Sequence, residues 1–242
     1  MTDLYVNTIV KEGMALSQEA FITSLAQRPY KLKGIEVRRE YFSLDPVQRE
    51  AEFLHILETG KHKKWQLLYS VPESLFLSNG LNPDLKVWLE EGKKMGIVSM
   101  KVNFGDLQGI SSVSKDELNT LLSSYKIKLT VENDQTIENG VLSEVLKGLQ
   151  LIEENQLSIG YTFDLGNWSV MDQDYEAAFK KMKKDISIFH LKNIDNKKQT
   201  VLLDEGVINW RLYLSTEYPI VLEYPMDWFA LETEIKKILE VK

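Results

Sequence analysis

The chain has 242 residues, of which 43% are hydrophobic and 27% charged, which is the composition of a globular domain with a substantial core. Its formal net charge of −7 argues against a nucleic-acid partner, because a protein usually needs a basic face to bind nucleic acid. The absence of cysteine excludes disulfides and thiolate metal sites, which leaves oxygen and imidazole as ligands for any metal.

The N-terminal residues lack the basic start and the long apolar core of a signal peptide. No apolar run approaches the roughly 20 residues that a membrane-spanning helix needs. We therefore expect a cytoplasmic protein without a membrane partner, and the lack of cysteine fits a reducing compartment.

In the first half of the chain, short β-forming runs alternate with segments of helical periodicity. Ser17 and Asp45 are predicted N-caps, Pro46 suits the first helical position, and Gly60 is predicted to close that helix. Ser114 begins a capping box. The predicted order is strand 4–10, helix 18–27, strand 34–37, helix 46–57, strand 65–71, helix 82–95, strand 97–103 and helix 114–124.

The second half of the chain repeats this alternation, beginning with the stretch 126–134, an apolar run that stops at Glu132. An amphipathic helix is predicted over 141–155. The remaining predicted elements are strand 157–164, helix 174–184, strand 186–190, strand 220–223 and helix 227–239.

Eight strands, nearly all followed by a helix at about 30 residues per unit, predict an α/β fold, a single-domain (β/α)8 TIM barrel over residues 1–242. The alternative is an open doubly wound sheet, which would have to explain eight units and four polar strand ends. The chain contains no Gly-x-Gly-x-x-Gly, Gly-Lys-Ser/Thr or Gly-x-Ser-x-Gly sequence. Dinucleotide-binding, P-loop and hydrolase-elbow functions therefore lack their motif.

Four successive predicted strands end in a residue type that ligates metals: Glu132, Asp164, His190 and Glu223. Because a barrel delivers the C-terminal ends of its strands to one face, we expect these side chains to meet. Three carboxylates this close repel one another unless a cation lies between them, so the pattern predicts a divalent-metal site. Oxygen-rich ligation with one nitrogen favours Mn²⁺, with Mg²⁺, Co²⁺ and Zn²⁺ as alternatives.

Taken singly, each of the four residues also has a purely structural explanation. Glu132 could cap the next helix, and Asp164 could form a turn. His190 could be a hydrogen-bonded core histidine, and Glu223 could pair with a basic neighbour. A metal site explains all four together, whereas the two other histidines fall on or after a helix and receive no role.

The motifs and their order resemble those of the xylose isomerase-like TIM barrel superfamily, the sugar phosphate isomerase/epimerase family, which also includes endonuclease IV. The resemblance covers essentially the whole chain. It implies that the matching Glu, Asp, His and Glu bind one divalent metal, and that the two glutamates flank the substrate. The matching segments are Gly34-Ile35-Glu36-Val37, Glu132-Asn133, Asp164-x-Gly166, His190-x-Lys192, Glu205-Gly206-Val207-Ile208-Asn209-Trp210 and Glu223.

The chain departs from the family at the sixth strand, where Asp-x-x-His is usual and Asn167 stands in place of the histidine. An asparagine forms hydrogen bonds but carries no proton at neutral pH, which puts a second-metal role in doubt. The third and fourth strands also lack the histidines that a three-zinc endonuclease needs. Together with the acidic balance, this argues against DNA repair.

The resemblance implies a metal-dependent isomerase or epimerase of carbohydrate metabolism, acting on a sugar, sugar phosphate or polyol through a metal-stabilised enediolate. Glu132 and Glu223 are the predicted catalytic residues, one removing a proton and the other returning it. The residues predicted to contact substrate are Glu36, Lys101, Asn103, Glu138, Asn167 and Lys192.

Two alternative functions stay open. One is a metal-dependent dehydratase of a cyclic polyol or keto acid, in which the same proton abstraction is followed by loss of a β-hydroxyl. The other is a barrel that binds a sugar without turning it over. The sequence does not determine the oligomeric state, and because such barrels often dimerise, a homodimer stays open as well.

Overall fold

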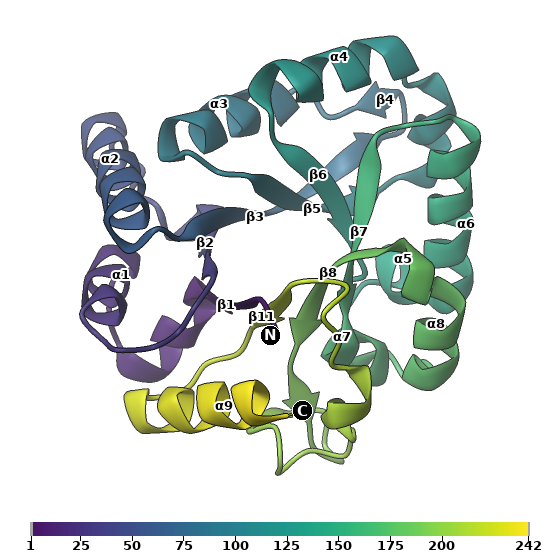
Figure 1. Cartoon of the computed structure of the whole chain (residues 1–242). Helices are drawn as coiled ribbons and strands as arrows, with labels where there is room; N and C mark the ends of the chain where they lie inside the picture. The colour runs from purple at the N-terminus through teal and green to yellow at the C-terminus, as the bar shows by residue number, and fades with distance from the viewer. Residues whose placement is uncertain (1, 242) are drawn as a thin grey trace.

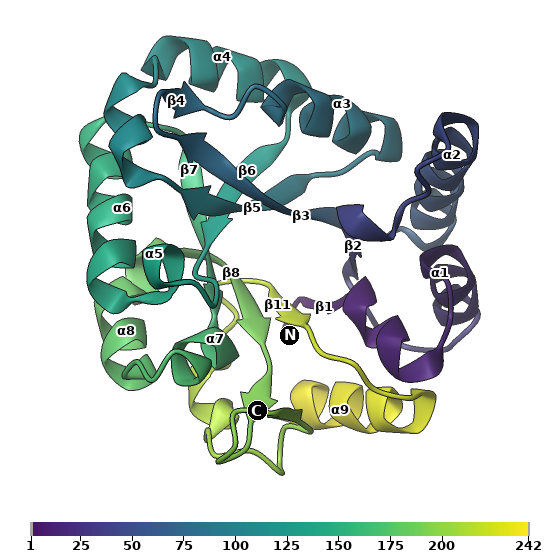
Figure 2. The same ribbon diagram turned by 180° about the vertical axis from the view of Figure 1, so that it is seen from behind.

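The structure, a computed structural model that describes residues 2–241, closes eight parallel strands into a ring (Figures 1 and 2). Neighbouring strands follow the order β2-β1-β11-β8-β7-β6-β5-β3, and pairing of β2 with β3 completes the circle. This confirms the predicted (β/α)8 barrel and excludes the open sheet. The barrel strands are β1 Leu4–Asn7, β2 Gly34–Arg38, β3 Gln66–Leu77, β5 Ser99–Gly105, β6 Lys128–Glu132, β7 Ile159–Asp164, β8 Ile186–Leu191 and β11 Ile220–Leu222.

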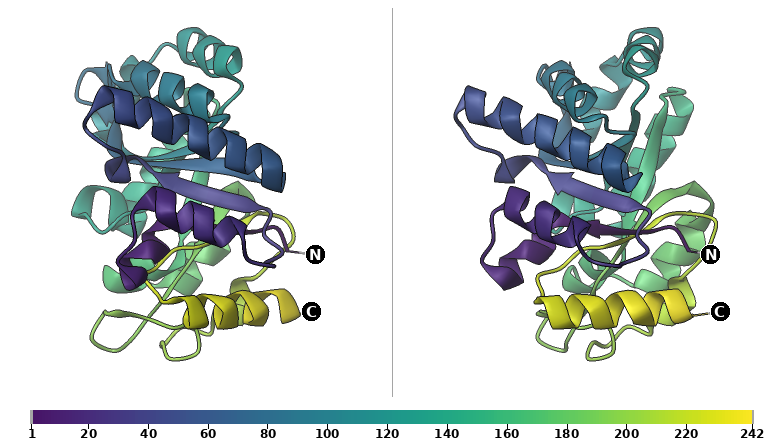
Figure 3. Two further views of the ribbon diagram at one scale, coloured as in Figure 1. Left: turned by 90° about the vertical axis from the view of Figure 1, so that its left-hand side faces the viewer. Right: turned by 60° about the vertical axis from the view of Figure 1, so that its left-hand side comes forward.

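Helices form the outer layer around the barrel (Figure 1), and the start of β1 and the end of α9 lie on the same side of the molecule (Figure 3). The predicted caps Ser17, Asp45 and Ser114 each accept a hydrogen bond from a backbone amide three residues further on. Among the described residues, no helix has the length and apolarity that a membrane crossing requires. The helices are α1 Gln18–Ala26, α2 Pro46–Lys63, α3 Leu85–Met95, α4 Lys115–Tyr125, α5 Ile137–Gly140, α6 Leu142–Glu154, α7 Leu165–Val170, α8 Tyr175–Met182 and α9 Trp228–Glu240.

Short elements complete the connections between the barrel strands and the helices. Strand β3 continues past the end of β2, remains paired with β5 as far as Phe76, and forms a hairpin with β4. The 3-10 helices are η1 Thr8–Met14, η2 Arg39–Tyr41, η3 Leu107–Ser112, η4 Lys183–Asp185 and η5 Trp210–Tyr213, and the short strands are β4 Gly80–Leu81, β9 Asn193–Ile194 and β10 Thr200–Val201.

Two element boundaries differ from the sequence predictions for identifiable reasons. The first strand ends at Asn7, because the side chain of Asn7 accepts a hydrogen bond from the Ile9 amide and begins η1. Helix α2 runs past Gly60 to Lys63, and Lys64 follows it as a C-cap in the left-handed conformation. A Cβ at position 60 would lie 2.8 Å from a methyl carbon of Leu67, so this glycine serves close packing rather than helix termination.

Alternation along the strands divides the sheet residues between two environments. Outward-facing residues such as Val37 and Val131 join the main core between sheet and helices. Inward-facing apolar residues form a separate small cluster toward the N-terminal end of the barrel. Two positions further along these strands, the inward-facing residues are polar and buried: Tyr5, Leu68, Ile188 and Val221 of the cluster give way to Asn7, Ser70, His190 and Glu223.

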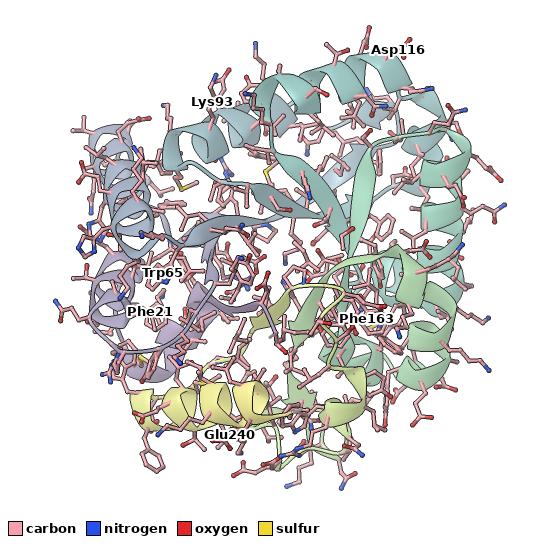
Figure 4. All side chains as sticks on the ribbon, in the orientation of Figure 1. Phe21, Trp65, Lys93, Asp116, Phe163 and Glu240 are labelled. Carbon is pink, nitrogen blue, oxygen red and sulfur yellow. The ribbon has the colours of Figure 1, made fainter. Side chains whose placement is uncertain are left out.

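An aromatic layer backs the strands that end in Asp164 and His190. The Phe163 ring, labelled in Figure 4, stacks on the Phe189 ring with centroids 5.4 Å apart. Each phenylalanine directly precedes one of these polar residues, so its ring points outward to the helices while the polar side chain points inward. The layer holds the two strand ends in place from behind.

Candidate metal centre

The four predicted metal ligands converge at the C-terminal end of the barrel. Glu132, Asp164, His190 and Glu223 each offer one ligand atom, and these atoms all lie within 4.8 Å of one another. They come from β6, β7, β8 and the residue after β11, which are neighbouring strands of the ring. All four side chains are buried. Ring closure therefore brings together residues that are far apart in the chain: Glu132 and Glu223 are separated by 91 positions.

The imidazole of His190 lies between three carboxylates. Its Nδ1 is 2.8 Å from both Glu132 Oε1 and Glu223 Oε2, and its Nε2 is 3.2 Å from Glu36 Oε2. Burial by itself lowers the pKa of His190, but Glu223, Glu36 and Glu132 together raise it well above its ordinary value. A proton and a metal ion thus compete for this imidazole.

Two lysines supply positive charge to the ligand carboxylates. Lys101 Nζ lies 2.5 Å from Glu132 Oε2, whereas Lys192 Nζ lies 2.8 Å from Asp164 Oδ2 and 3.9 Å from Glu223 Oε2. Burial lowers the pKa of each lysine, but the neighbouring carboxylates outweigh it and raise both pKa values overall. Both side chains are therefore ammonium ions at neutral pH.

The carboxylates respond differently to this surrounding charge. Burial raises the pKa of Glu132 and of Glu223, but nearby cations outweigh it, so that both pKa values lie below the ordinary one. For Asp164 burial wins: together with the charges of the two glutamates it raises the pKa to about 7, against the opposing effect of Lys192. Asp164 is thus the ligand whose negative charge most needs a further cation.

Two residues of the centre were not predicted from the sequence. Asn7 Nδ2 donates to Glu36 Oε2 at 2.5 Å and to Glu223 Oε1 at 3.2 Å. Arg38 Nη1 donates to the same Oε1 of Glu223 at 3.1 Å. A signal was present, because each is a polar residue two positions after an inward-facing residue of its strand, Tyr5 and Glu36 respectively.

Asn133 and Asn167 hold the backbone around Asp164. The buried Asn133 donates to the Asp164 carbonyl at 2.9 Å and accepts from the Asp164 amide at 2.9 Å and the Tyr161 hydroxyl at 2.7 Å. Asn167 donates its amide to Asp164 Oδ1 and its side-chain NH₂ to the Asn133 carbonyl, both at 2.9 Å, and accepts from Gln135 at 2.9 Å. Asn167 thus cross-links the segment after β6 to the start of α7.

The donor set fits a divalent metal. Within residues 2–241, Glu132 Oε1 and Asp164 Oδ2 are buried and receive no aligned hydrogen bond, although each lies 2.8 Å from a nitrogen of His190 or Lys192. Buried polar atoms without hydrogen bonds are costly, and a cation can satisfy oxygen and nitrogen lone pairs together. Carboxylate oxygens with one imidazole suit Mn²⁺, Mg²⁺, Co²⁺ or Zn²⁺.

A cavity of about 430 Å³ opens next to the centre, a size suited to a small molecule. Among the predicted residues, both catalytic glutamates and four substrate-contact candidates line it: Glu132, Glu223, Lys101, Asn103, Asn167 and Lys192. Glu36 lies below the cavity wall, 1% exposed, against His190. Glu138 is exposed on α5 and lines a different hollow, beside the β3–β4 hairpin. A larger cavity of about 890 Å³ lies at the opposite, N-terminal end of the barrel.

Comparisons with known proteins show the fold. No protein-family model and no curated protein matches the chain. The probable 3-DHS dehydratase AsbF of Bacillus anthracis has a similar structure, with a TM-score of 0.75 and 14% identity over 99% of this chain and 100% of that one. The D-psicose 3-epimerase of Clostridium cellulolyticum H10 with D-tagatose has a TM-score of 0.67 and 12% identity, and the match covers 99% of this chain and 97% of that one. The IOLI protein with a bound zinc atom has a TM-score of 0.67 and 16% identity, and the match covers 100% of this chain and 96% of that one.

Xylose isomerase domain proteins and an AP endonuclease of family 2 are also among the similar structures. The structural neighbours are thus xylose isomerase-like TIM barrel proteins, as the strand-end motifs indicated. At these low identities the likeness shows the fold alone.

Proposed function

We propose that the chain is a divalent-metal-dependent isomerase or epimerase of a sugar or sugar phosphate. The observation that carries this proposal is the convergence of Glu132, Asp164, His190 and Glu223 within 4.8 Å beside a cavity of about 430 Å³. The whole-chain likeness to a sugar epimerase and to a zinc-bound barrel supports it.

The four converging residues would hold the ion, which when bound supplies Lewis-acid polarisation of a substrate carbonyl and its neighbouring hydroxyl. Glu36 orients the imidazole of His190 from the side opposite to Glu132 and Glu223. Such a carboxylate on the second nitrogen of a ligating histidine is a common way to set its ring orientation. Asn7 in turn holds Glu36 through its 2.5 Å hydrogen bond.

Proton transfer is assigned to Glu132 and Glu223, which both line the cavity. They enter it from β6 and β11, strands that are separated in the ring by β7 and β8, so they face a bound substrate from different sides. Neighbouring cations lower the pKa of each, so both are ionised bases at neutral pH. One ionised carboxylate takes the proton from the carbon next to the carbonyl. The other, after taking up a proton from water, returns it to the opposite face, and the first then releases its proton to water so that both end ionised.

Hydrogen exchange tests this assignment. Mn²⁺-loaded protein, incubated with a panel of ketoses and ketose phosphates in deuterated water, should place solvent deuterium on the carbon next to the carbonyl and form an isomer or epimer. Glu132→Gln and Glu223→Gln should each slow this exchange about 10²-fold or more. The exposed Glu58→Gln on α2 is the matched control and should keep the wild-type rate. Binding without exchange across the panel would favour a non-catalytic sugar-binding barrel.

A metal-dependent dehydratase is the second candidate, which the likeness to the probable dehydratase AsbF favours. The same carboxylate would remove a proton from the carbon next to the carbonyl, and the hydroxyl on the following carbon would leave as water. Mass spectrometry of the product separates the two: isomerisation leaves the mass unchanged, whereas dehydration removes one water.

A further inference from the structure

The ligand carboxylates of the proposed metal centre are already paired with two lysines of the chain. Lys101 contacts Glu132 at 2.5 Å, and Lys192 contacts Asp164 at 2.8 Å. The side chain of Lys101 is 4% exposed and that of Lys192 12% exposed, yet both line the cavity of about 430 Å³. They are therefore cations in a sheltered place, on the wall that a substrate would touch.

The position of Lys192 is built into the fold. Gly166 lies beneath its aliphatic stem, and a Cβ at that glycine would approach Lys192 Cγ to 2.4 Å. The glycine of the Asp164-Leu-Gly-Asn turn thus leaves room for the stem, and the Nζ reaches the carboxylate of the same turn. Asp164 Oδ2, the atom that Lys192 approaches, is also one of the buried atoms without an aligned hydrogen bond.

A divalent ion on Glu132 and Asp164 competes with the two ammonium groups for the same carboxylates. A bound ion would neutralise part of the carboxylate charge that faces the two lysines. It would also repel both ammonium groups, because like charges in a sheltered site interact strongly. A buried cation without a counter-charge is unfavourable, so the lysines then require another anion. Both lysines line the cavity, so an anion that pairs with them would lie there.

The other charged groups of the cavity wall do not meet this need. Asp134 already accepts hydrogen bonds from the amide and hydroxyl of Thr136 and from Asn139. Arg38 has Glu40 as a partner at 2.5 Å, a carboxylate outside the proposed metal centre. Apart from the proposed metal ligands, the other residues that line the cavity are uncharged, among them Asn103 and Asn167.

We propose that Lys101 and Lys192 form an anion subsite, so that the substrate carries a carboxylate or phosphate group and binds cooperatively with the metal. This rests on the proposed function for the metal centre and adds the chemical class of the substrate. Cooperativity is reciprocal: metal tightens anion binding, and the anion tightens metal binding by the same factor.

Calorimetric titration with ligands that cannot isomerise tests the subsite. Sorbitol is the neutral probe, and sorbitol 6-phosphate and gluconate are the phosphate and carboxylate probes. Protein loaded with Mn²⁺ should bind one of the two anions about 10-fold or more tighter than it binds sorbitol, and about 10-fold tighter than the metal-free protein binds that anion. Which anion binds more tightly identifies the group. A titration of Mn²⁺ with each probe alone corrects for chelation.

Substitutions separate the subsite from the metal centre. Lys192→Met and Lys101→Met should each remove the preference for the anion while the protein keeps its Mn²⁺, and Lys192→Arg should retain part of the preference. The exposed Lys236→Met on α9, which loses only a pair with Glu232, is the matched control. Thermal unfolding of each variant shows that it is folded.

The outcomes distinguish this inference from the proposed function. Mn²⁺ retained with equal affinity for sorbitol and both anions would overturn the anion subsite alone. Anion binding that is as tight without Mn²⁺ would overturn the coupling. A wild-type protein that retains no divalent ion would overturn the metal centre, and the coupled subsite with it.

Discussion

At the scale of single residues, the contacts of Glu36 change its expected role. It was predicted to contact substrate, but it is 1% exposed and lies beneath the cavity, 3.2 Å from His190 Nε2. A carboxylate in this place acts through the imidazole: it orients the ring and favours metal binding at the other nitrogen. We therefore propose that Glu36 positions the imidazole of His190 in the proposed metal centre.

Glu36→Gln tests this role, because it keeps the shape of the side chain and removes its charge. We expect Mn²⁺ affinity to fall about 10-fold to 100-fold, as is usual for residues that orient metal ligands. Titration against a fluorescent chelator measures the affinity. Unchanged affinity in Glu36→Gln, with Glu58→Gln as the surface control, would contradict the assignment.

At the scale of elements, the aromatic layer behind β7 and β8 supports the strand ends that carry Asp164 and His190. Phe189 stacks on Phe163 at 5.4 Å and on Tyr218 at 5.4 Å, and it is fully buried. Neighbouring residues on one strand point to opposite faces, so the packing of Phe189 determines where the His190 side chain enters the barrel.

Phe189→Ala should lower the free energy of unfolding by about 3 to 5 kcal/mol, because it removes a large buried ring and leaves a cavity. Urea denaturation measures the change. Phe229→Ala on α9 is the matched control: this ring is 83% exposed, and its loss should change the free energy by no more than about 0.5 kcal/mol. Equal effects of the two substitutions would show that the aromatic layer does not stabilise the barrel.

At the scale of the whole molecule, the proposed metal centre ties four of the eight barrel strands to one point. An ion at this site binds the folded barrel and not the unfolded chain, because the unfolded chain does not bring these side chains together. Metal therefore stabilises the fold by mass action, in proportion to its concentration over its dissociation constant.

Saturating Mn²⁺ should raise the melting temperature by about 5 to 10 °C: an excess of 100-fold over Kd contributes about 2.7 kcal/mol, and each kcal/mol shifts a chain of this size by about 2 to 4 °C. Thermal unfolding with Mn²⁺ and with EDTA measures the shift. His190→Ala should abolish it, and an equal shift in that variant would place the ion elsewhere.

Much of the fold and part of the site followed from local patterns. Eight β-forming runs with helices between them indicated the barrel, and the structure has those eight strands in sequence. The residues at the ends of the last four strands were found because βα units of similar length return each strand end to one face. The cap residues were found because capping depends only on neighbours within three or four positions.

The amino-acid sequence by itself thus determined the order of elements, the inward or outward direction of strand residues and the identity of the four converging side chains. Only the tertiary structure decided which cation meets which carboxylate: Lys101 on Glu132 and Lys192 on Asp164. It also decided that β2 pairs with β3 to close the ring. The reason is physical, because these pairings depend on strand register, twist and rotamers across the ring, which no local run of residues encodes.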